Sequence, residues 1–153
     1  MPSGDLRAAG AHYVRPGFRM LPDMTPESRS FWTGGERGEL LIYRCRSCGH
    51  FFHPPTPACY RCQSREVGPE ATSGRARVAA STVTEHQWFE GWPPPYLIAL
   101  VELDDEPDVR LTTNIVGCPF DEVRIGMAVE VTFEHWQDEL GEVWIPLFRP
   151  AGT

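Results

Sequence analysis

The chain has 153 residues and a formal net charge of −7 at neutral pH, a size that suits one domain or one domain with a small appendage. No apolar run reaches the roughly 18 residues that a membrane span needs, and residues 1–10 lack the apolar segment of an export signal. These patterns exclude an obvious membrane or secreted protein, and the cytoplasm is the expected location.

Charge divides the chain into two halves. All 14 basic residues are arginine, which we interpret as a mark of a GC-rich genome rather than of function. Residues 1–65 hold nine arginines and five acidic residues, a net charge of +4, whereas residues 66–153 hold five arginines and sixteen acidic residues, a net charge of −11. Because an acidic surface repels phosphate backbones, this balance disfavours nucleic acid as a partner.

The first 24 residues are rich in proline and glycine without a period, which predicts a loosely ordered N-terminal arm. Its basic and aromatic side chains either dock on a partner or form a surface tail: Tyr13, Arg15, Phe18 and Arg19. Thr25-Pro26-Glu27 then predicts the start of a helix, with threonine as the N-cap and proline at the first helical position. This helix would carry Phe31 and Trp32 and end at Gly34-Gly35.

A strand-like segment, Glu39 to Arg44, leads into four cysteines spaced Cys45-x2-Cys48-x10-Cys59-x2-Cys62. Thiolates from two such knuckles can bind one tetrahedral metal ion at about 2.3 Å each, and four sulfur ligands leave no position open for water, so the site should be structural. Zinc is the expected metal, although the spacing also allows iron. Disulfides are disfavoured without an export signal, and a redox pair would not explain the second CxxC.

The residues around the cysteines have simpler interpretations. His50 and His53 are expected to be bystanders, because four thiolates already complete the metal site. Nearby guanidinium groups would offset the negative charge of the thiolates: Arg44, Arg46, Arg61 and Arg65. Cys118 is expected to be a buried, inert thiol rather than a nucleophile, since no Cys/His/Asn arrangement accompanies it.

Beyond Gly68 the pattern is that of β-strands. We expect strands at residues 74–86, 96–103, 109–116, 127–136 and 143–148, with a helical turn at 119–124. In the fourth strand one face holds Met127, Val129, Val131 and Phe133, and the other holds Glu130, Thr132 and Glu134. Five strands with a helical turn before the fourth predict a closed or partly closed barrel of the OB type.

The expected fold is therefore mostly β and has three parts. An N-terminal arm and short helix occupy residues 1–37, a rubredoxin-like zinc ribbon with four cysteines occupies 38–67, and a five-stranded OB-fold barrel occupies 68–153.

No catalytic motif stands out, because the sequence has no glycine-rich phosphate loop, no nucleophile elbow and no His-Glu-x-x-His pattern. His86 and His135 are better explained by structural roles than as general bases, and the acidic residues at 104–108 suit a solvated hairpin tip. The loop at 87–95 carries three large aromatic residues beside three prolines, and tryptophan is common in interface hot spots. This loop either docks on a partner or ligand or folds back over one end of the barrel.

A set of short motifs along the chain is specific when taken together. They are Phe31-Trp32, Gly38-Glu39-Leu40, the four cysteines, Pro54-Pro55, Ser73-Gly74-Arg75, Pro95-Tyr96, Val101-Glu102-Leu103, Gly126-Met127 and Pro146-Leu147-Phe148. With these residues the chain, from about Phe31 onward, resembles a family of small proteins that join a rubredoxin-like zinc ribbon to an OB-fold.

The resemblance implies a non-catalytic partner subunit of thiolase-superfamily enzymes or of acyl-CoA hydratases. Members accompany acetoacetyl-CoA thiolase with HMG-CoA synthase, an acyltransferase of phloroglucinol biosynthesis, and the hydratase and retro-aldolase of steroid side-chain degradation. The chain lacks the catalytic domain of the fused members, which suggests a stand-alone accessory subunit without activity of its own.

The resemblance also implies structural Zn²⁺, a thiolase-like partner in a hetero-oligomer of two plus two chains, and indirect contact with acyl-CoA. The residues expected to bind partner or ligand are Phe31, Trp32, Trp88, Phe89, Trp92, Tyr96, Arg75 and Arg77, with Arg110 as a further candidate for a coenzyme A phosphate. Two alternatives stay open: a module that binds single-stranded nucleic acid on aromatic platforms, and a free-standing enzyme that uses His86, His135 or Cys118.

Overall fold

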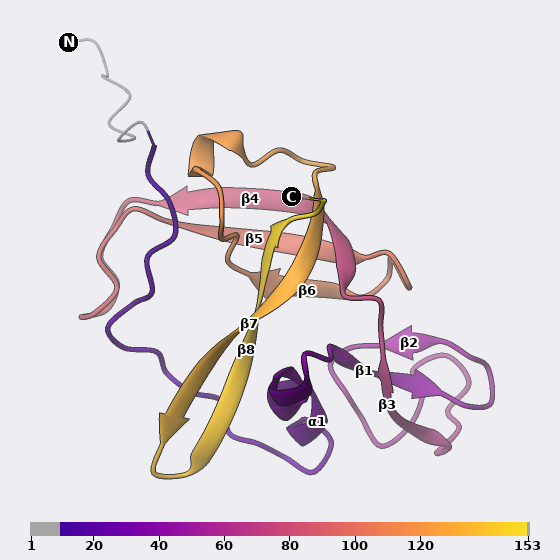
Figure 1. Ribbon diagram of the computed structural model, residues 1–153. Helices are drawn as coiled ribbons and strands as arrows, with labels where there is room; N and C mark the ends of the chain where they lie inside the picture. The colour runs from indigo at the N-terminus through magenta and orange to yellow at the C-terminus, as the bar shows by residue number, and fades with distance from the viewer. Residues whose placement is uncertain (1–9, 153) are drawn as a thin grey trace.

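The computed structural model describes residues 10–152. In chain order the elements are α1 (Arg29–Thr33), the 3₁₀ helix η1 (Gly34–Arg37), β1 (Leu41–Cys45), β2 (Phe51–Phe52), β3 (Val67–Ala71), β4 (Arg75–Thr84), β5 (Tyr96–Leu103), β6 (Arg110–Thr113), the 3₁₀ helix η2 (Phe120–Glu122), β7 (Ala128–Asp138) and β8 (Gly141–Pro150). Within this part of the chain no helix has the length and apolar character to cross a bilayer. Figure 1 shows a barrel of long strands with a small sheet beside it.

The barrel contains five antiparallel strands in the order β6-β5-β4-β7-β8. A parallel bridge between Ile115, just after β6, and Phe148 in β8 joins the two edge strands and closes the sheet. Strand β5 buries every second side chain, and Val101, Val129 and Phe148 have no exposed surface. The OB-type barrel predicted from the alternation of apolar residues is therefore confirmed.

The ribbon is a three-stranded sheet with the order β2-β1-β3. The sequence indicates β1 but not its two neighbours, because Phe51–Phe52 is too short to show a period and Val67–Ala71 contains a glycine and a proline. All five residues of β3 pair with β1, so the ribbon sheet ends at Ala71, four residues beyond the predicted limit. The limits 1–37, 38–67 and 68–153 stay predictions for the domains.

The predicted helix is present, but both of its ends are wrong. Helix α1 begins at Arg29 instead of Pro26, but Thr25 still caps the turn before it, because Thr25 Oγ1 accepts from the Ser28 amide at 3.1 Å and Ser28 Oγ accepts from the Thr25 amide at 2.9 Å. Gly34 and Gly35 do not end the helical path, which continues as η1 to Arg37. The two glycines are instead places of close approach: a Cβ on Gly35 would clash with Phe133 in β7 and Trp144 in β8.

Strands β7 and β8 form a long hairpin that extends beyond the barrel. Their pairing runs from Val129 opposite Pro150 to Asp138 opposite Gly141. In Figure 1 helix α1 lies beside the projecting half of this hairpin, between the barrel and the ribbon. The hairpin thus joins the barrel to the N-terminal helix.

The N-terminal arm, as far as it is described, is neither a free tail nor detached from the barrel. His12 pairs with Pro119, and Phe120 donates its amide hydrogen to the carbonyl of Ala11. In Figure 1 the arm continues down the side of the barrel before it reaches α1. Residues 1–9, the start of the predicted arm, lie outside the described residues.

We predict that Gly35→Ala lowers the free energy of unfolding by about 1–3 kcal/mol, because the new methyl group must displace Phe133 or the backbone of η1. Urea denaturation measures this change. Gly17→Ala is the matched control, since a Cβ there meets nothing within 4 Å, and its stability should stay within about 1 kcal/mol of the parent. Equal stability of Gly35→Ala and the parent would contradict the packing described.

Candidate functional site: a four-cysteine metal centre and an aromatic cavity

The four cysteine thiols of the ribbon converge on one point. The Sγ atoms of Cys45 and Cys62 lie 3.5 Å apart, those of Cys48 and Cys59 lie 3.7 Å apart, and all four fall within 4.8 Å of one another. Four sulfur atoms bound tetrahedrally to one ion at about 2.3 Å are separated by about 3.8 Å. None of the cysteines is in a disulfide, so the four thiols fit a closed metal centre.

Backbone amide groups stabilise the thiolate form of two of the cysteines, Cys45 and Cys59. The amide of Cys48 points at the Sγ of Cys45 at 3.4 Å, and the amide of Arg61 points at the Sγ of Cys59 at 3.3 Å. Chiefly through the Cys48 amide, the pKa of Cys45 falls to about 6, and chiefly through the Cys62 amide the pKa of Cys59 is also lowered. Both thiols are buried, so these amides replace water around the charge.

The two knuckles reach this geometry with different residues. Gly49, one residue after the first pair, has φ +78, and Gln63, one residue after the second pair, has φ +62. Glycine adopts this left-handed conformation without strain, whereas glutamine is uncommon there. A glycine after a CxxC pair therefore indicates a knuckle in the sequence for the first pair, whereas the second pair has no such glycine.

Two residues near the four cysteines, Arg44 and His53, make contacts of their own with other parts of the chain. Arg44 donates to the carbonyl of Gly49 at 2.9 Å and to Glu70 at 3.1 Å. His53 packs against Phe31 with the rings tilted and their centroids 4.7 Å apart, and burial lowers the pKa of His53, so it favours the neutral form.

A second feature is a cavity of about 330 Å³ on the barrel surface, which we call the aromatic cavity. Its lining comes from the arm, the loop before β5, strands β5, β6 and β8, and the residue after β6: Phe18, Arg19, Met20, Phe89, Trp92, Tyr96, Ile98, Thr112, Thr113, Asn114, Ile145, Pro146 and Leu147. This size and apolar character are typical of a site for a small molecule or for part of one. Three of the residues predicted to bind a partner or ligand, Phe89, Trp92 and Tyr96, lie in its wall.

The arm and the loop before β5 hold each other at the rim of this cavity. Gly17 donates its amide hydrogen to the carbonyl of Gly91 at 3.1 Å. Gly91 has φ +82, and a Cβ there would lie 3.0 Å from the Cβ of Phe18, so only glycine allows the two segments this close. The ring of Trp92 packs against Tyr96 at 5.1 Å and lies under the guanidinium of Arg19 at 4.9 Å.

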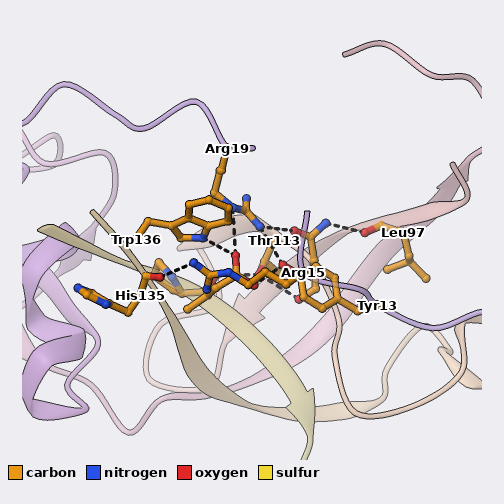
Figure 2. Close-up of polar contacts among 10 residues, drawn as sticks. Tyr13, Arg15, Arg19, Leu97, Thr113, His135 and Trp136 are labelled. Carbon is orange, nitrogen blue, oxygen red and sulfur yellow. Dashed lines mark hydrogen bonds and ion pairs between the residues drawn. The ribbon is translucent and has the colours of Figure 1, made fainter. Parts of the chain in front are cut away.

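A buried polar network links the arm to strand β7, as Figure 2 shows. Its centre is Glu134, which is only 8% exposed and accepts hydrogen bonds from Tyr13 Oη, Arg19 Nε (3.3 Å) and Trp136 Nε1 (2.6 Å). Burial and the bond to Glu134 raise the pKa of Tyr13, so the phenol stays protonated and donates. Glu134 was expected on the polar face of its strand, and it is buried there because the arm covers that face.

Further bonds extend the network to the floor of the aromatic cavity. Arg19 also donates to Asn114 Oδ1 at 3.3 Å, and Asn114 Nδ2 donates to the carbonyl of Leu97 at 2.8 Å. Arg15 donates to the carbonyl of His135 at 2.7 Å and lies 4.0 Å above the Trp136 ring. Because these donors are already engaged by the protein, the cavity presents an apolar surface to a ligand.

A larger hollow of about 640 Å³ adjoins the aromatic cavity and shares Arg19, Met20, Thr112, Ile145 and Pro146 with it. Phe31, Trp32 and Arg110 line this second hollow. Phe31 itself is only 8% exposed and packs edge to face on Trp32, so its main role is in the core. Arg110 is paired with Glu102 at 2.7 Å.

Other predicted binding residues lie apart from the cavity. Trp88 does not line it but is 64% exposed beside Phe89, which is 57% exposed. Arg75 and Arg77 lie on β4, and Arg77 donates to the carbonyl of Gly126 at 3.1 Å. None of these placements tests the predicted binding roles, which stay predictions.

The sequence singles out Tyr13, Arg15 and Arg19 of the arm, but it shows neither their network with Glu134 nor the β8 part of the cavity wall. Arg19 and Glu134 are 115 positions apart, and no local pattern links them. The one available signal is the concentration of basic and aromatic residues in the arm.

Comparison with known proteins identifies the family of the chain. The family model for the rubredoxin-like zinc ribbon domain of ChsH2 matches residues 32–68, and the model for the C-terminal OB-fold domain of ChsH2 matches residues 70–134. The chain belongs to the ChsH2 family. The expected combination of zinc ribbon and OB-fold is thereby confirmed.

Two curated relatives are subunits of acyl-CoA hydratases. The chain is 32% identical, over 87% of its length, to a "Probable enoyl-CoA hydratase alpha subunit" of Thermomonospora curvata. It is also 32% identical, over 86% of its length, to the 3-oxo-4,17-pregnadiene-20-carboxyl-CoA hydratase alpha subunit of Mycobacterium tuberculosis. The chain spans only 40% and 41% of the length of these two proteins.

A solved structure is similar over almost its whole length. The structure of the Ltp2-ChsH2(DUF35) aldolase contains a chain that is 31% identical to this one, with a TM-score of 0.73, over 86% of this chain and 99% of that chain. This ChsH2 family member therefore has the architecture of a protein solved as part of a two-protein aldolase.

We predict that the four-cysteine centre of the parent protein carries one metal ion and that Cys48→Ser greatly reduces its occupancy, because one of four thiolates is lost. Metal analysis of the purified proteins by atomic emission measures the content. Chelation of the parent should also unfold the ribbon, since metal binding supplies folding free energy there. Cys118→Ser is the matched control, because Cys118 lies apart from this group, and an equal loss of metal in that variant would contradict the assignment.

We predict that Glu134→Ala lowers the free energy of unfolding by about 3 kcal/mol, because Arg19 stays largely buried without its counter-charge. Urea denaturation again provides the measurement. Glu142→Ala, on the neighbouring strand, removes an exposed pair with His135 and should cost at most about 1 kcal/mol. Similar losses in the two variants would show that the arm is not held by Glu134.

Proposed function

We propose that this ChsH2 family member is a non-catalytic accessory subunit of a complex that acts on an acyl-CoA. The observation that carries this proposal is the likeness to the ChsH2 chain of the Ltp2-ChsH2 aldolase, which extends over 99% of that chain. In this proposal the partner is a thiolase-like enzyme, the complex is a hetero-oligomer of two plus two chains in the cytoplasm, and the ribbon metal is Zn²⁺.

The described residues support an accessory role because they offer no assembled catalytic set. Four thiolates close the metal centre to water. Burial raises the pKa of Cys118, which opposes its use as a nucleophile. His135 is occupied with Glu142 at 3.1 Å, and His86 packs against Trp88 with ring centroids 4.6 Å apart.

The surface that we propose for the partner is the exposed aromatic edge of the loop before β5. Trp88 and Phe89 are joined there by Phe18 and Met20 of the arm, which are 50% and 73% exposed. Buried tryptophan and phenylalanine side chains are common centres of binding energy in interfaces. Partner binding on this edge would cover the mouth of the aromatic cavity.

The aromatic cavity is the part of the substrate site that we assign to this chain. Its wall is apolar and its polar floor is internally satisfied, so it suits the hydrocarbon part of an acyl group rather than the charged nucleotide of coenzyme A. A steroid side chain is one such acyl group, and the M. tuberculosis relative, named as a hydratase of a pregnadiene carboxyl-CoA, supports this class.

Co-expression with a thiolase-like enzyme from the same organism tests the proposal. We expect the two proteins to purify together and the enzyme to lose activity or solubility without this chain. If the enzyme is soluble and fully active alone, the proposal is wrong.

We predict that Trp88→Ala combined with Phe89→Ala weakens the complex by at least about 30-fold, in line with the loss of a hot spot worth 2 kcal/mol or more. Titration calorimetry with the purified partner measures the affinity. Ile125→Ala removes an apolar side chain that is 75% exposed outside this loop and serves as the matched control. Equal weakening by the control, or none by the double variant, would place the interface elsewhere.

A further inference from the structure

The ribbon and the barrel meet where the first cysteine knuckle faces the turn between β5 and β6. His50 follows the knuckle, and its side chain is only 9% exposed. Its Nδ1 lies 3.2 Å from Oε2 of Glu106, which belongs to that turn. The approach does not have the geometry of a hydrogen bond, so Nδ1 is buried without a hydrogen-bond partner among the described residues. A buried polar atom of this kind normally requires a partner.

Asp108 of the same turn completes a group of three potential ligands. One ligand atom from each of His50, Glu106 and Asp108 lies within 4.8 Å of the others. Atoms bound to a common ion at about 2.1 Å are at most about 4.2 Å apart, so small rotations of the side chains bring all three into contact with one ion. The turn that holds the two carboxylates is fixed by a hydrogen bond of 2.9 Å from the Val109 amide to the Glu106 carbonyl.

We propose that His50, Glu106 and Asp108 form a second metal site, which binds a divalent cation of the Mn²⁺ or Zn²⁺ class and ties the ribbon to the barrel. One imidazole nitrogen and two carboxylates suit these ions, whereas the four thiolates nearby select softer ones. The cation gives the buried Nδ1 its partner and neutralises the two carboxylates. Water fills the coordination positions that the three side chains leave open.

Arg61 competes for the same place. Its guanidinium lies 3.8 Å from Asp108 Oδ2, and the two side chains are 60% and 71% exposed. An ion pair this long and this exposed holds Asp108 only weakly. A divalent ion can therefore displace Arg61, and removal of the guanidinium should favour the ion.

Manganese separates this site from the cysteine centre, because Mn²⁺ prefers oxygen and nitrogen ligands to thiolate. The purified full chain, with its cysteine centre filled, is titrated with Mn²⁺, and free Mn²⁺ is followed by electron paramagnetic resonance. We expect one Mn²⁺ bound per chain. An absence of binding at millimolar Mn²⁺, the weak end of the range for protein cation sites, would overturn the proposal.

Variants of the carboxylates and of Arg61 should move the affinity in opposite directions. Glu106→Gln and Asp108→Asn should each weaken Mn²⁺ binding by at least about tenfold, since loss of mere outer-shell partners already costs that much. Arg61→Gln should strengthen it. Asp104→Asn is the matched control on the same turn and should leave the Mn²⁺ affinity unchanged. An effect equal to that of Asp108→Asn would show that Mn²⁺ is attracted by the negative charge of the turn and is not bound by specific ligands, which would overturn the proposal.

The role of His50 is tested separately, because substitution of a buried residue beside the ribbon can disturb its fold. Bound Mn²⁺ should broaden the NMR signals of the His50 imidazole before those of His135, which lies outside the proposed group. Binding that broadens both histidines equally would show that the imidazole is not a ligand and would overturn the proposed site.

Discussion

The ribbon depends on one constraint, which is that four sulfur atoms must share one ion. Its own buried cluster contains Cys45, Phe52 and Cys59, with Tyr43 and Val67 packed against them, while Ile42 and Phe51 of the ribbon strands belong to the main core. A cluster this small removes too little apolar surface from water to offset the entropy of ordering three strands and two knuckles. The metal bonds therefore supply much of the stability that a larger hydrophobic core would give the ribbon.

The barrel, in contrast, has a continuous apolar core and uses a buried ionic network for a different purpose. Glu134 binds Tyr13, Arg19 and Trp136 on the face of the hairpin that points away from the main core. This network positions the arm, and the arm in turn supplies Phe18 and Met20 to the aromatic cavity. The buried carboxylate of Glu134 thus helps to form the aromatic cavity, although it does not line that cavity itself.

The sequence allowed prediction of features that rest on local patterns, and failed where distant segments decide the outcome. Strand β5 lies where its apolar run predicts, because Pro95 and Asp104 interrupt the run at both ends. The cysteine spacing equally suffices to indicate the metal centre. The burial of Glu134 escaped prediction, since it depends on the arm. Helix α1 starts later than predicted, although Thr25 makes the predicted capping bond with the Ser28 amide. The aromatic loop was identified as a candidate, but the cavity beneath it needs residues of β8 that carry no chemical signal of their own.

The exposed aromatic edge has a consequence for how the protein is produced. Phe18, Met20, Trp88 and Phe89 together place unusual apolar area in contact with water on a chain of only 153 residues. Such surface is an aggregation hazard as long as nothing covers it. If this chain is synthesised in excess over the protein that covers that edge, the unbound copies should aggregate and the yield of folded chain should fall. The two proteins should therefore be expressed in matched amounts.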